Sequence, residues 1–571
     1  MPPVQFEFFL ASALEKVFPA VRPTEMADGS RLSAWRGTRA SVQLVYRATL
    51  NGAHFSDVRF DLIVEGAPCQ PSIRKVEYEP VELPAFGTAD NMYLRYEPGL
   101  YPDILQPMAE PIVNPRAEQY RSVWLTWDIP EDAAPGLYDV TITARARTFD
   151  QLTPNSKPQK VEGVDGLAFT CRLQLNVCRA QLPEQKLIHT EWFHSDCLCT
   201  YYGVEAMSEE YWRITENFIR NATHHGINMI LTPIFTPPLD TAVGAERPTI
   251  QLVEVGAKDG EFCFDFTRLE RWLALCRKHN VKYLEIPHFF TQWGAKATPK
   301  IVATIDGREH KLFGWDIPAT SPMYRAFLEA LIPQLRAKLT EQGYDQEHVY
   351  YHVSDEPHLD QLDDYNAARQ MILDLLDGCP IIDALSNLEF YQQGVVEHPV
   401  PSNNRVQPFI DAKVPDLWTY YCCGQGDQVP NRFLAMPSAR NRIMGVLMYM
   451  NDIVGFLQWG YNFYYSRHSG YPIDPYRTAD GEMTWPAGDP FIVYPGKDGE
   501  PVDSLRAEVQ YDGFVDMRAL QLLEDVCGRD AAEAIVRAGT DEAMTFDAYP
   551  RDAEYLLSLR ERVADAIDAA L

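Results

Sequence analysis

The stretch FTRLERWLALCRKHNVKYLEIPHFF (266–290) shows the pattern that decides the fold. Its first part, residues 266–280, reads as a helix, and its second part, residues 281–290, is a short apolar run typical of a buried strand. A helix that leads directly into such a strand is typical of a βα unit, and a series of these units builds a parallel sheet. We therefore expect an α/β fold in this part of the chain.

The same alternation extends in both directions, from residue 183 to residue 460. Helical stretches such as 208–225 and 321–342 separate the apolar runs. Eight strands with intervening helices over about 280 residues match the size of a (β/α)8 TIM barrel. The eight expected strands are LIHTEWF (187–193), INMILTP (227–233), VKYLEIPHFF (281–290), HVYYHVSD (348–355), PIIDALSN (380–387), GVVEHPV (394–400), DLWTYYC (416–422) and VGFLQWG (454–460).

Residues before 183 follow a different pattern, with short β-branched or aromatic runs bounded by Gly and Pro. The clearest unit is 122–146, in which two alternating strands surround a turn that contains Pro, Asp and Gly. Such spacing predicts an N-terminal all-β, antiparallel sandwich. Further strands are expected at SVQLVYRATL (41–50), RFDLIVEG (59–66), SIRKVEYEPVEL (72–83) and LAFTCRLQLNVCRA (167–180).

A helical C-terminal segment completes the predicted organisation. Residues 504–526 and the Ala-rich, charged tail to Leu571 look helical. We expect a β-sandwich domain at 1–182, a (β/α)8 catalytic barrel at 183–500, and a helical segment at 501–571 that packs on the barrel. Three roles stay open for the sandwich: binding glycan, shaping the pocket of a neighbouring subunit in a homo-oligomer, or serving as scaffold.

The charge balance excludes several classes of partner. Lys and Arg number 51 against 80 Asp and Glu, a net charge of -29 among 571 residues. Repulsion from phosphate groups disfavours binding to nucleic acid or to an anionic membrane surface. No stretch of about 18 uncharged apolar residues occurs, so no membrane span is expected.

The N-terminus and the cysteines predict a cytoplasmic protein. The first residues lack the basic region of a secretory signal, and eleven cysteines, an odd number, suit a reducing compartment. Cys197 and Cys199 lie near His189 and His194, but their spacing differs from that of metal sites. Buried thiols are therefore expected, with no metal and no other cofactor.

The strongest local signal for chemistry is HVYYHVSDEPHLDQLDDY (348–365). A strand rich in Val and Tyr leads into Asp355, Glu356 and Pro357, after which an amphipathic helix is expected to begin. Pro357 suits the first helical position, where the missing N–H costs nothing. The two acids then lie at the C-terminal end of a barrel strand, the rim where such barrels place their active sites.

Two neighbouring carboxyl groups are suited to acid–base chemistry on a glycosidic bond. Because like charges repel, one of them keeps its proton while the other ionises. The usual acid and nucleophile or base of a glycosidase flank the bond, about 5–9.5 Å apart, and come from different strands. Adjacent acids suit a substrate-assisted route better, in which the 2-acetamido oxygen of the sugar is the nucleophile. The alternative is that Asp355 and Glu356 only cap a helix, since acids favour its first turn.

These residues resemble a known family. The sequence His352-Val353-Ser354-Asp355-Glu356-Pro357, with the later SLRAE (504–508), GFVD (513–516) and VGFLQWG (454–460), is similar to the catalytic domain of glycoside hydrolase family 123. The likeness covers about residues 185–530, and the β-rich region before it resembles the N-terminal sandwich of that family. The segments 191–203, 285–300 and 383–394 look like a bacterial subgroup, in which the likeness to the galactosaminidases is looser.

The resemblance implies a retaining, metal-free β-N-acetylgalactosaminidase assisted by the acetamido group of its substrate. It implies that Asp355 orients and stabilises this group, and that Glu356 is the general acid and then the base. A carbohydrate is the expected partner.

Further side chains at the predicted strand ends are candidates for binding the sugar. Trp and Tyr rings stack on the flat faces of sugars, while acids, amides and His bind hydroxyl groups. Each candidate is also compatible with a purely structural role. The candidate substrate-binding residues are Trp459, Tyr421, Tyr420, Asn387, Trp293, His288, Trp192 and Glu191.

Two alternative functions stay open. The first is a glycosidase for a different sugar, in which Glu191, Glu285 or Glu389 completes an ordinary mechanism with two carboxylates. The second is a non-catalytic carbohydrate-binding barrel. A binding protein has no need to keep two like charges adjacent, which favours the enzyme.

Overall fold

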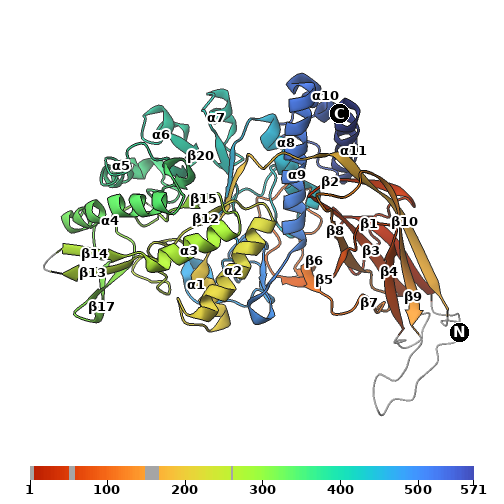
Figure 1. Cartoon of the computed structure of the whole chain (residues 1–571), viewed down its shortest axis with the longest axis horizontal. Helices are drawn as coiled ribbons and strands as arrows, with labels where there is room; N and C mark the ends of the chain where they lie inside the picture. Colours follow the sequence, from red (N-terminus) through yellow and green to blue (C-terminus); the bar gives the residue numbers. More distant parts are fainter. Residues whose placement is uncertain (1–4, 50–57, 148–165, 259–260, 293) are drawn as a thin grey trace, which may run out of the picture.

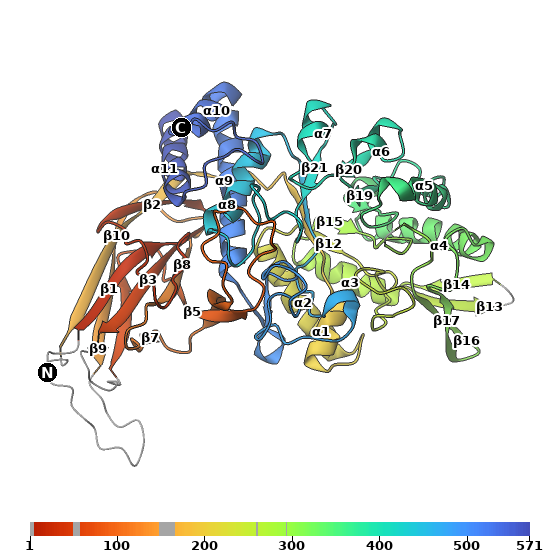
Figure 2. The same cartoon turned by 180° about the vertical axis from the view of Figure 1, so that it is seen from behind.

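The structure, a computed structural model, describes residues 5–49, 58–147, 166–258, 261–292 and 294–571. A β-sandwich forms its N-terminal part, at the right of Figure 1, and a barrel of strands with surrounding helices forms its middle part. The C-terminal helices lie at the top of the junction between these parts, and Figure 2 shows the same arrangement from behind. Every helix among the described residues is too short or too polar to cross a bilayer.

Two five-stranded sheets form the sandwich, with strand orders β1-β3-β8-β5-β6 and β2-β10-β9-β4-β7. Most neighbours are antiparallel, as predicted, while β2 pairs with β10 in parallel. Apolar side chains of both sheets, such as Leu125 and Ile142, meet in one core. The strands are β1 Gln5–Ser12, β2 Ser30–Arg36, β3 Arg39–Thr49, β4 Arg59–Glu65, β5 Ser72–Val81, β6 Gly99–Pro107, β7 Ile112–Val113, β8 Arg121–Asp128, β9 Gly136–Arg147 and β10 Ala168–Gln181.

The two strands predicted at 122–146 both exist, but their expected position around one turn is wrong. β8 pairs with β3 and β5 in the first sheet, whereas β9 pairs with β4 and β10 in the second. Residues 129–135 therefore cross from one sheet to the other. Each strand buries one face in the shared core, so its alternating pattern is the same in a hairpin and in a crossover.

Each of the eight predicted barrel runs contains a strand. Six form one parallel sheet in the order β18-β15-β12-β11-β22-β21, and β19 pairs with β20. Single parallel bridges join Tyr351 to Ile381 and Ser402 to Tyr420, which closes the ring. The predicted TIM-type barrel is thereby confirmed. Its strands are β11 Ile188–Glu191, β12 Met229–Leu231, β15 Tyr283–Glu285, β18 Val349–Tyr350, β19 Ile382–Ala384, β20 His398–Val400, β21 Trp418–Tyr420 and β22 Gly455–Gln458.

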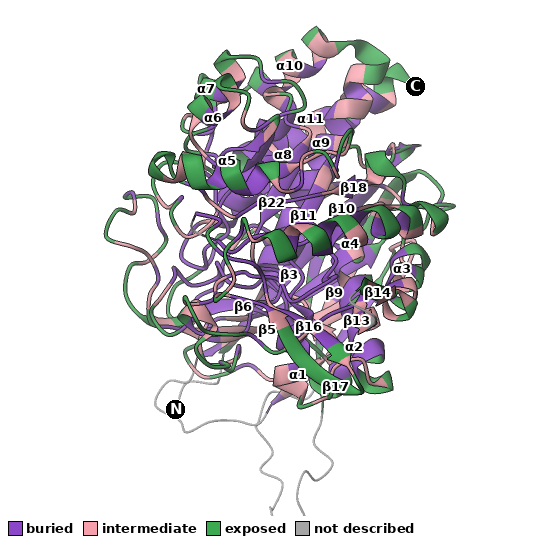
Figure 3. Ribbon diagram, turned by 90° about the vertical axis from the view of Figure 1, so that its left-hand side faces the viewer, coloured by how far each residue is buried: buried purple, intermediate pink, exposed green. Residues whose placement is uncertain are grey.

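Apolar side chains from these strands fill the barrel interior, among them Met229, Leu231, Ile382, Trp418 and Leu457. Figure 3 shows buried residues along the strands and exposed residues along the outer faces of α4 and α5. The helices are α1 Ser195–Tyr202, α2 Glu209–His224, α3 Thr267–Lys278, α4 Pro322–Glu341, α5 Leu362–Gln370, α6 Leu388–Gln392, α7 Gln407–Asp411, α8 Ser438–Met450, α9 Leu505–Cys527, α10 Arg529–Arg537 and α11 Ala553–Ala570, with short 3-10 turns η1 Gln346–His348, η2 Leu359–Gln361, η3 Arg467–Ser469 and η4 Lys497–Gly499.

Two small sheets interrupt the regular alternation. The first has the strand order β14-β13-β16-β17 and lies at the far left of Figure 1. Its strands belong to connections that leave β12 and β15 on the way to α3 and α4. The bounds are β13 Glu254–Lys258, β14 Glu261–Asp265, β16 Ile301–Ile305 and β17 Arg308–Phe313, and the second sheet pairs β23 Tyr494–Pro495 with β24 Pro501–Val502.

Helix α9 follows β22 in the chain and packs against α8, in the place of the eighth barrel helix. Two glycines let these helices touch backbone to backbone. A Cβ atom on Gly445 would lie 1.8 Å from the carbonyl oxygen of Gly513, and one on Gly513 would lie 2.5 Å from that of Arg442. The division of the chain at 182 and 500 stays a prediction.

Candidate active site

The paired acids Asp355 and Glu356 follow β18 in the chain, and both are half-buried. The expected helix does not begin at Pro357: the 3-10 turn η2 starts at Leu359, and α5 starts at Leu362. Glu356 has φ 44°, a left-handed conformation that side chains other than Gly adopt at a cost. The prediction of a helix start at Pro357 is therefore wrong, and the two acids do not cap α5.

Burial raises the pKa of Asp355 well above its usual value, and the neighbouring charge of Glu356 raises it further. The charge of His352 acts in the opposite direction, whereas those of Asp383 and Asp240 add to the rise. A carboxyl in this setting takes up a proton far more readily than one in water. Asp355 therefore stays protonated at a higher pH than an isolated Asp does.

Tyr420 and Asp489 surround Glu356 from other parts of the barrel. The hydroxyl of Tyr420, at the end of β21, donates a hydrogen bond of 2.7 Å to Oε1 of Glu356. Asp489 is fully buried, and burial raises its pKa to about 7, with a further contribution from the charge of Glu356 against the opposing effect of Arg432. Trp459 donates from Nε1 to Oδ2 of Asp489 at 3.0 Å. Its ring is half-buried next to that of Trp485, with 5.2 Å between the centroids.

A buried polar network lies at the ends of three neighbouring strands. His352 bonds through Nε2 to Oε1 of Glu285 at 2.6 Å and through Nδ1 to Oδ1 of Asp383 at 3.2 Å. Glu285 also accepts bonds from Trp192 Nε1, at 2.8 Å, and from the hydroxyl of Thr190. Both ring nitrogens of His352 and both carboxyl oxygens of Glu285 are thus engaged within this network.

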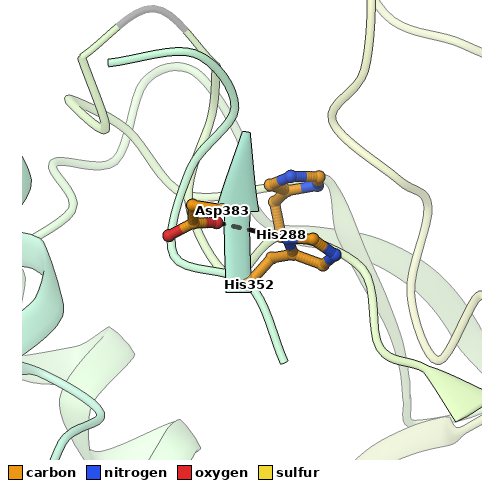
Figure 4. Close-up of side chains that lie close together, drawn as sticks. All are labelled: His288, His352 and Asp383. Atoms are coloured by element: carbon orange, nitrogen blue, oxygen red, sulfur yellow. Dashed lines mark hydrogen bonds and ion pairs between the residues drawn. The ribbon is translucent and has the colours of Figure 1, made fainter. Parts of the chain in front are cut away.

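His288 packs on this network. Figure 4 shows its ring next to that of His352, with the centroids 4.2 Å apart and the planes 27° from parallel. Neither ring nitrogen of His288 has a hydrogen-bond partner among the described residues. Burial and the charge of His352 hold the pKa of His288 well below its usual value.

His288, His352 and Asp383 lie close enough for a metal site, with one potential ligand atom from each within 4.8 Å of the others. However, an ion binds in the plane of an imidazole ring, and an ion in the plane of one stacked ring lies outside the plane of the other. Both nitrogens of His352 also already bond to carboxylates. This donor set does not fit a metal.

Glu191 and Trp192 lie inside the protein. Glu191 accepts a bond of 2.7 Å from Arg432 Nη1 and one of 2.5 Å from Gln510 Nε2. Burial alone would raise its pKa, but Arg432 and His189 hold it at about 2. Trp192 is 3% exposed and turns its ring nitrogen to Glu285. In this structure both side chains support the barrel.

Two other predicted residues, Tyr421 and Asn387, bond to groups other than the paired acids. Tyr421 is fully buried, with its hydroxyl 3.4 Å from Oε1 of Gln510. Asn387 caps α6, because its side-chain oxygen accepts a bond of 3.0 Å from the N–H of Glu389. Trp293 lies outside the described residues.

Sequence reasoning missed Asp489 and Asp240. Asp240 lies in the connection after β12, has φ 41°, and has a buried Oδ2 without a hydrogen-bond partner among the described residues. Its charge contributes to the raised pKa of Asp355. Both acids come from long loops without a local motif. Their only sequence signal is an acid in a segment that follows a barrel strand.

A closed barrel with two adjacent, half-buried carboxyl groups at a strand end has the architecture of a carbohydrate-active hydrolase. Comparison with protein families agrees. Residues 192–523 match the model described as "Glycoside hydrolase 123, catalytic domain". Since the match covers more than half of the chain, this protein belongs to glycoside hydrolase family 123. No curated protein sequence matches the chain significantly.

One solved structure resembles the chain over its whole length. A family 123 glycoside hydrolase from Clostridium perfringens, described in connection with glycolipid glycan hydrolysis, superposes with a TM-score of 0.70 at 14% identity, covering 99% of this chain and 98% of that one. This likeness shows that the fold is shared. A putative β-galactosidase from Bacteroides fragilis gives a TM-score of only 0.30 at 9% identity, covering 89% of this chain and 60% of that one, and carries no argument.

Proposed function

We propose that this family 123 glycoside hydrolase is a retaining β-N-acetylgalactosaminidase that uses the acetamido group of its substrate as nucleophile. The observation that carries the proposal is the setting of Asp355 and Glu356. Both are half-buried in the loop that follows β18, and neither caps a helix. Two adjacent acids can serve one acetamido group and one leaving oxygen, which lie next to each other on the sugar.

In the proposed first step, the acetamido N–H donates to Asp355, which favours the ionised form of this carboxyl. The acetamido oxygen attacks C1 while the bond from C1 to the leaving oxygen breaks. The proton of Glu356 passes to that oxygen, and a bicyclic oxazolinium ion remains. In the second step, water attacks C1, Glu356 takes its proton, and the acetamido group is regenerated with the original configuration at C1.

The ordinary mechanism with two separate carboxylates finds less support. Glu191 is bound by Arg432 and Gln510, and Glu285 is fully buried among His352, Trp192 and Thr190. A nucleophile needs a free oxygen facing the sugar, which neither side chain offers. Glu389 is exposed on α6, and its backbone N–H bonds to Asn387.

Trp459 and Tyr420 are proposed as substrate contacts. Tyr420 bonds to Glu356, and the ring of Trp459 is half-buried and held by Asp489. A fixed indole face suits the apolar face of a sugar ring. The Clostridium perfringens enzyme is described as acting on glycolipid glycans, so the terminal sugar of such a glycan is a proposed substrate here.

The test is a comparison of two aryl glycosides, the 2-acetamido-2-deoxy-β-galactoside and the plain β-galactoside. We expect hydrolysis of the first and a rate at least about 10³-fold lower for the second, since the nucleophile is missing. Equal rates would contradict assistance by the acetamido group. Binding of the amino sugar without any hydrolysis would instead favour the non-catalytic barrel.

We further propose a cytoplasmic location, which the eleven free cysteines support. Fractionation of the producing cell, with immunodetection of the protein, tests this location directly.

A further inference from the structure

His352 is bonded at both ring nitrogens to oxygens that are themselves saturated with donors. Asp383 accepts the hydroxyl of Tyr365 at 2.5 Å and the N–H of Val353 at 3.1 and 3.2 Å. Glu285 accepts Trp192 and Thr190. The oxygens of both carboxyl groups already accept several hydrogen bonds, so neither carboxyl group needs a proton of its own. Both ring nitrogens of His352 are therefore expected to carry a proton.

The surroundings favour the charged ring. Burial opposes the charge, but the hydrogen bonds to Asp383 and Glu285 raise the pKa of His352 to about 9. His288 lies against the face of the ring and, since its own pKa is lowered, stays neutral beside the cation. Figure 4 shows His352 together with Asp383 of β19 and the ring of His288, and Glu285 at the end of β15 bonds to the other ring nitrogen.

The same network is joined to the segment that carries the paired acids. Asp383 bonds to His352 and also to the backbone N–H of Val353, two residues before Asp355. The charge of His352 opposes the rise in the pKa of Asp355 that burial, Glu356, Asp383 and Asp240 cause. His352 is the one cation among these named contributors.

We propose that His352 is a positioning residue, an imidazolium held between Glu285 and Asp383 that favours the ionised form of Asp355 when substrate fills the site. This inference rests on the proposed function, in which Asp355 must be an anion to stabilise the oxazolinium ion. Without the imidazolium, Asp355 would hold its proton to higher pH, and the acetamido group would lose its stabilising partner.

The kinetic test uses His352→Gln, which retains an amide donor but removes the charge. We expect the acid limb of the kcat/KM profile on the aryl 2-acetamido galactoside to move up by about one pH unit or more, while the alkaline limb stays in place. Tyr365→Phe, which removes one hydrogen bond from the network but no charge, is expected to show no upward shift. A loss of activity that is uniform at every pH would reduce His352 to a structural role and overturn the proposal.

A second measurement needs no stable His352 variant. In wild-type protein labelled with ¹⁵N-histidine, one of the thirteen histidines is expected to carry protons on both ring nitrogens at pH 8, and Tyr365→Phe should perturb that signal. The absence of any doubly protonated ring at pH 8 would overturn the proposal. If wild type instead cleaved both galactosides equally, the proposed function would fail while the NMR result stood.

Discussion

At the scale of single residues, the proposed chemistry is concentrated in one short segment. Asp355 and Glu356 could be predicted from sequence because they follow an apolar strand directly and need no distant partner to be noticed. Asp489 and Asp240 could not, since only the closed barrel brings their loops toward the pair. The left-handed backbone of Glu356 was equally invisible, because no Gly marks it.

Glu356→Gln tests the assignment of the acid. With a sugar as leaving group we expect kcat to fall about 10²- to 10⁴-fold, since the leaving oxygen receives no proton. A dinitrophenyl leaving group needs no protonation, so its kcat/KM, which reports the first step alone, should fall far less than that of the substrate with a sugar leaving group. The substitution also removes the charge of Glu356, which lowers the pKa of Asp355. The acid limb of the kcat/KM profile with the dinitrophenyl substrate should therefore move to lower pH. Equal losses with both leaving groups would contradict the assignment.

Tyr420→Phe tests the hydrogen bond to Glu356. Loss of this bond should lower kcat about tenfold and leave the thermal midpoint almost unchanged, because the ring stays in place. Tyr421→Phe is the matched control, since the hydroxyl of Tyr421 makes a weak bond to Gln510 and not to Glu356. An equal effect of the two substitutions on kcat would argue against a role for Tyr420.

At the scale of elements, the periodic helices and the eight strands could be read from sequence, since each buries one apolar face or run. The start of α5 could not, because a favourable Pro357 was outweighed by the loop that carries the acids. The contact between α8 and α9 depends on Gly445 and Gly513. Gly513 belongs to the GFVD motif (513–516), but the motif alone did not predict a close helix contact.

Gly445→Ala tests this helix contact. The added Cβ would lie 1.8 Å from the backbone of Gly513, so α8 and α9 must separate. We expect a loss of about 3 kcal/mol in the free energy of unfolding, measured by denaturant titration. Gly87→Ala is the control: nothing lies within 4 Å of its new Cβ atom, so the free energy of unfolding should change little. A stable Gly445→Ala variant would show that the two helices are not tightly packed.

At the scale of the whole molecule, buried ion pairs join the sandwich to α9. Glu508 pairs with Arg39 at 3.0 Å and with Arg74 at 2.8 Å. Burial opposes its charge, yet Arg39 and Arg74 hold the pKa of Glu508 well below its usual value of 4.5. The pairs link strands β3 and β5 to a barrel helix. They could not be predicted from sequence because the partners lie more than 400 residues apart.

Glu508→Gln should therefore destabilise the protein by about 3 kcal/mol at pH 7, as it leaves two buried guanidinium groups without this partner. Because the folded pKa of Glu508 is depressed, its contribution is present above pH 4.5 and is lost as the pH falls below that value. The difference from wild type should shrink accordingly in acid. The exposed pair of Glu209 and Arg271 provides the control, and Glu209→Gln should not change the unfolding midpoint.

The most direct measurement is a crystal structure with a galactosamine-derived thiazoline, which mimics the bicyclic intermediate. We predict its ring nitrogen within about 2.6–3.2 Å of a carboxylate oxygen of Asp355, with Glu356 beside the anomeric carbon. A thiazoline bound with Asp355 turned away, or with another carboxylate at its ring nitrogen, would contradict the proposed chemistry and leave only the family and the fold.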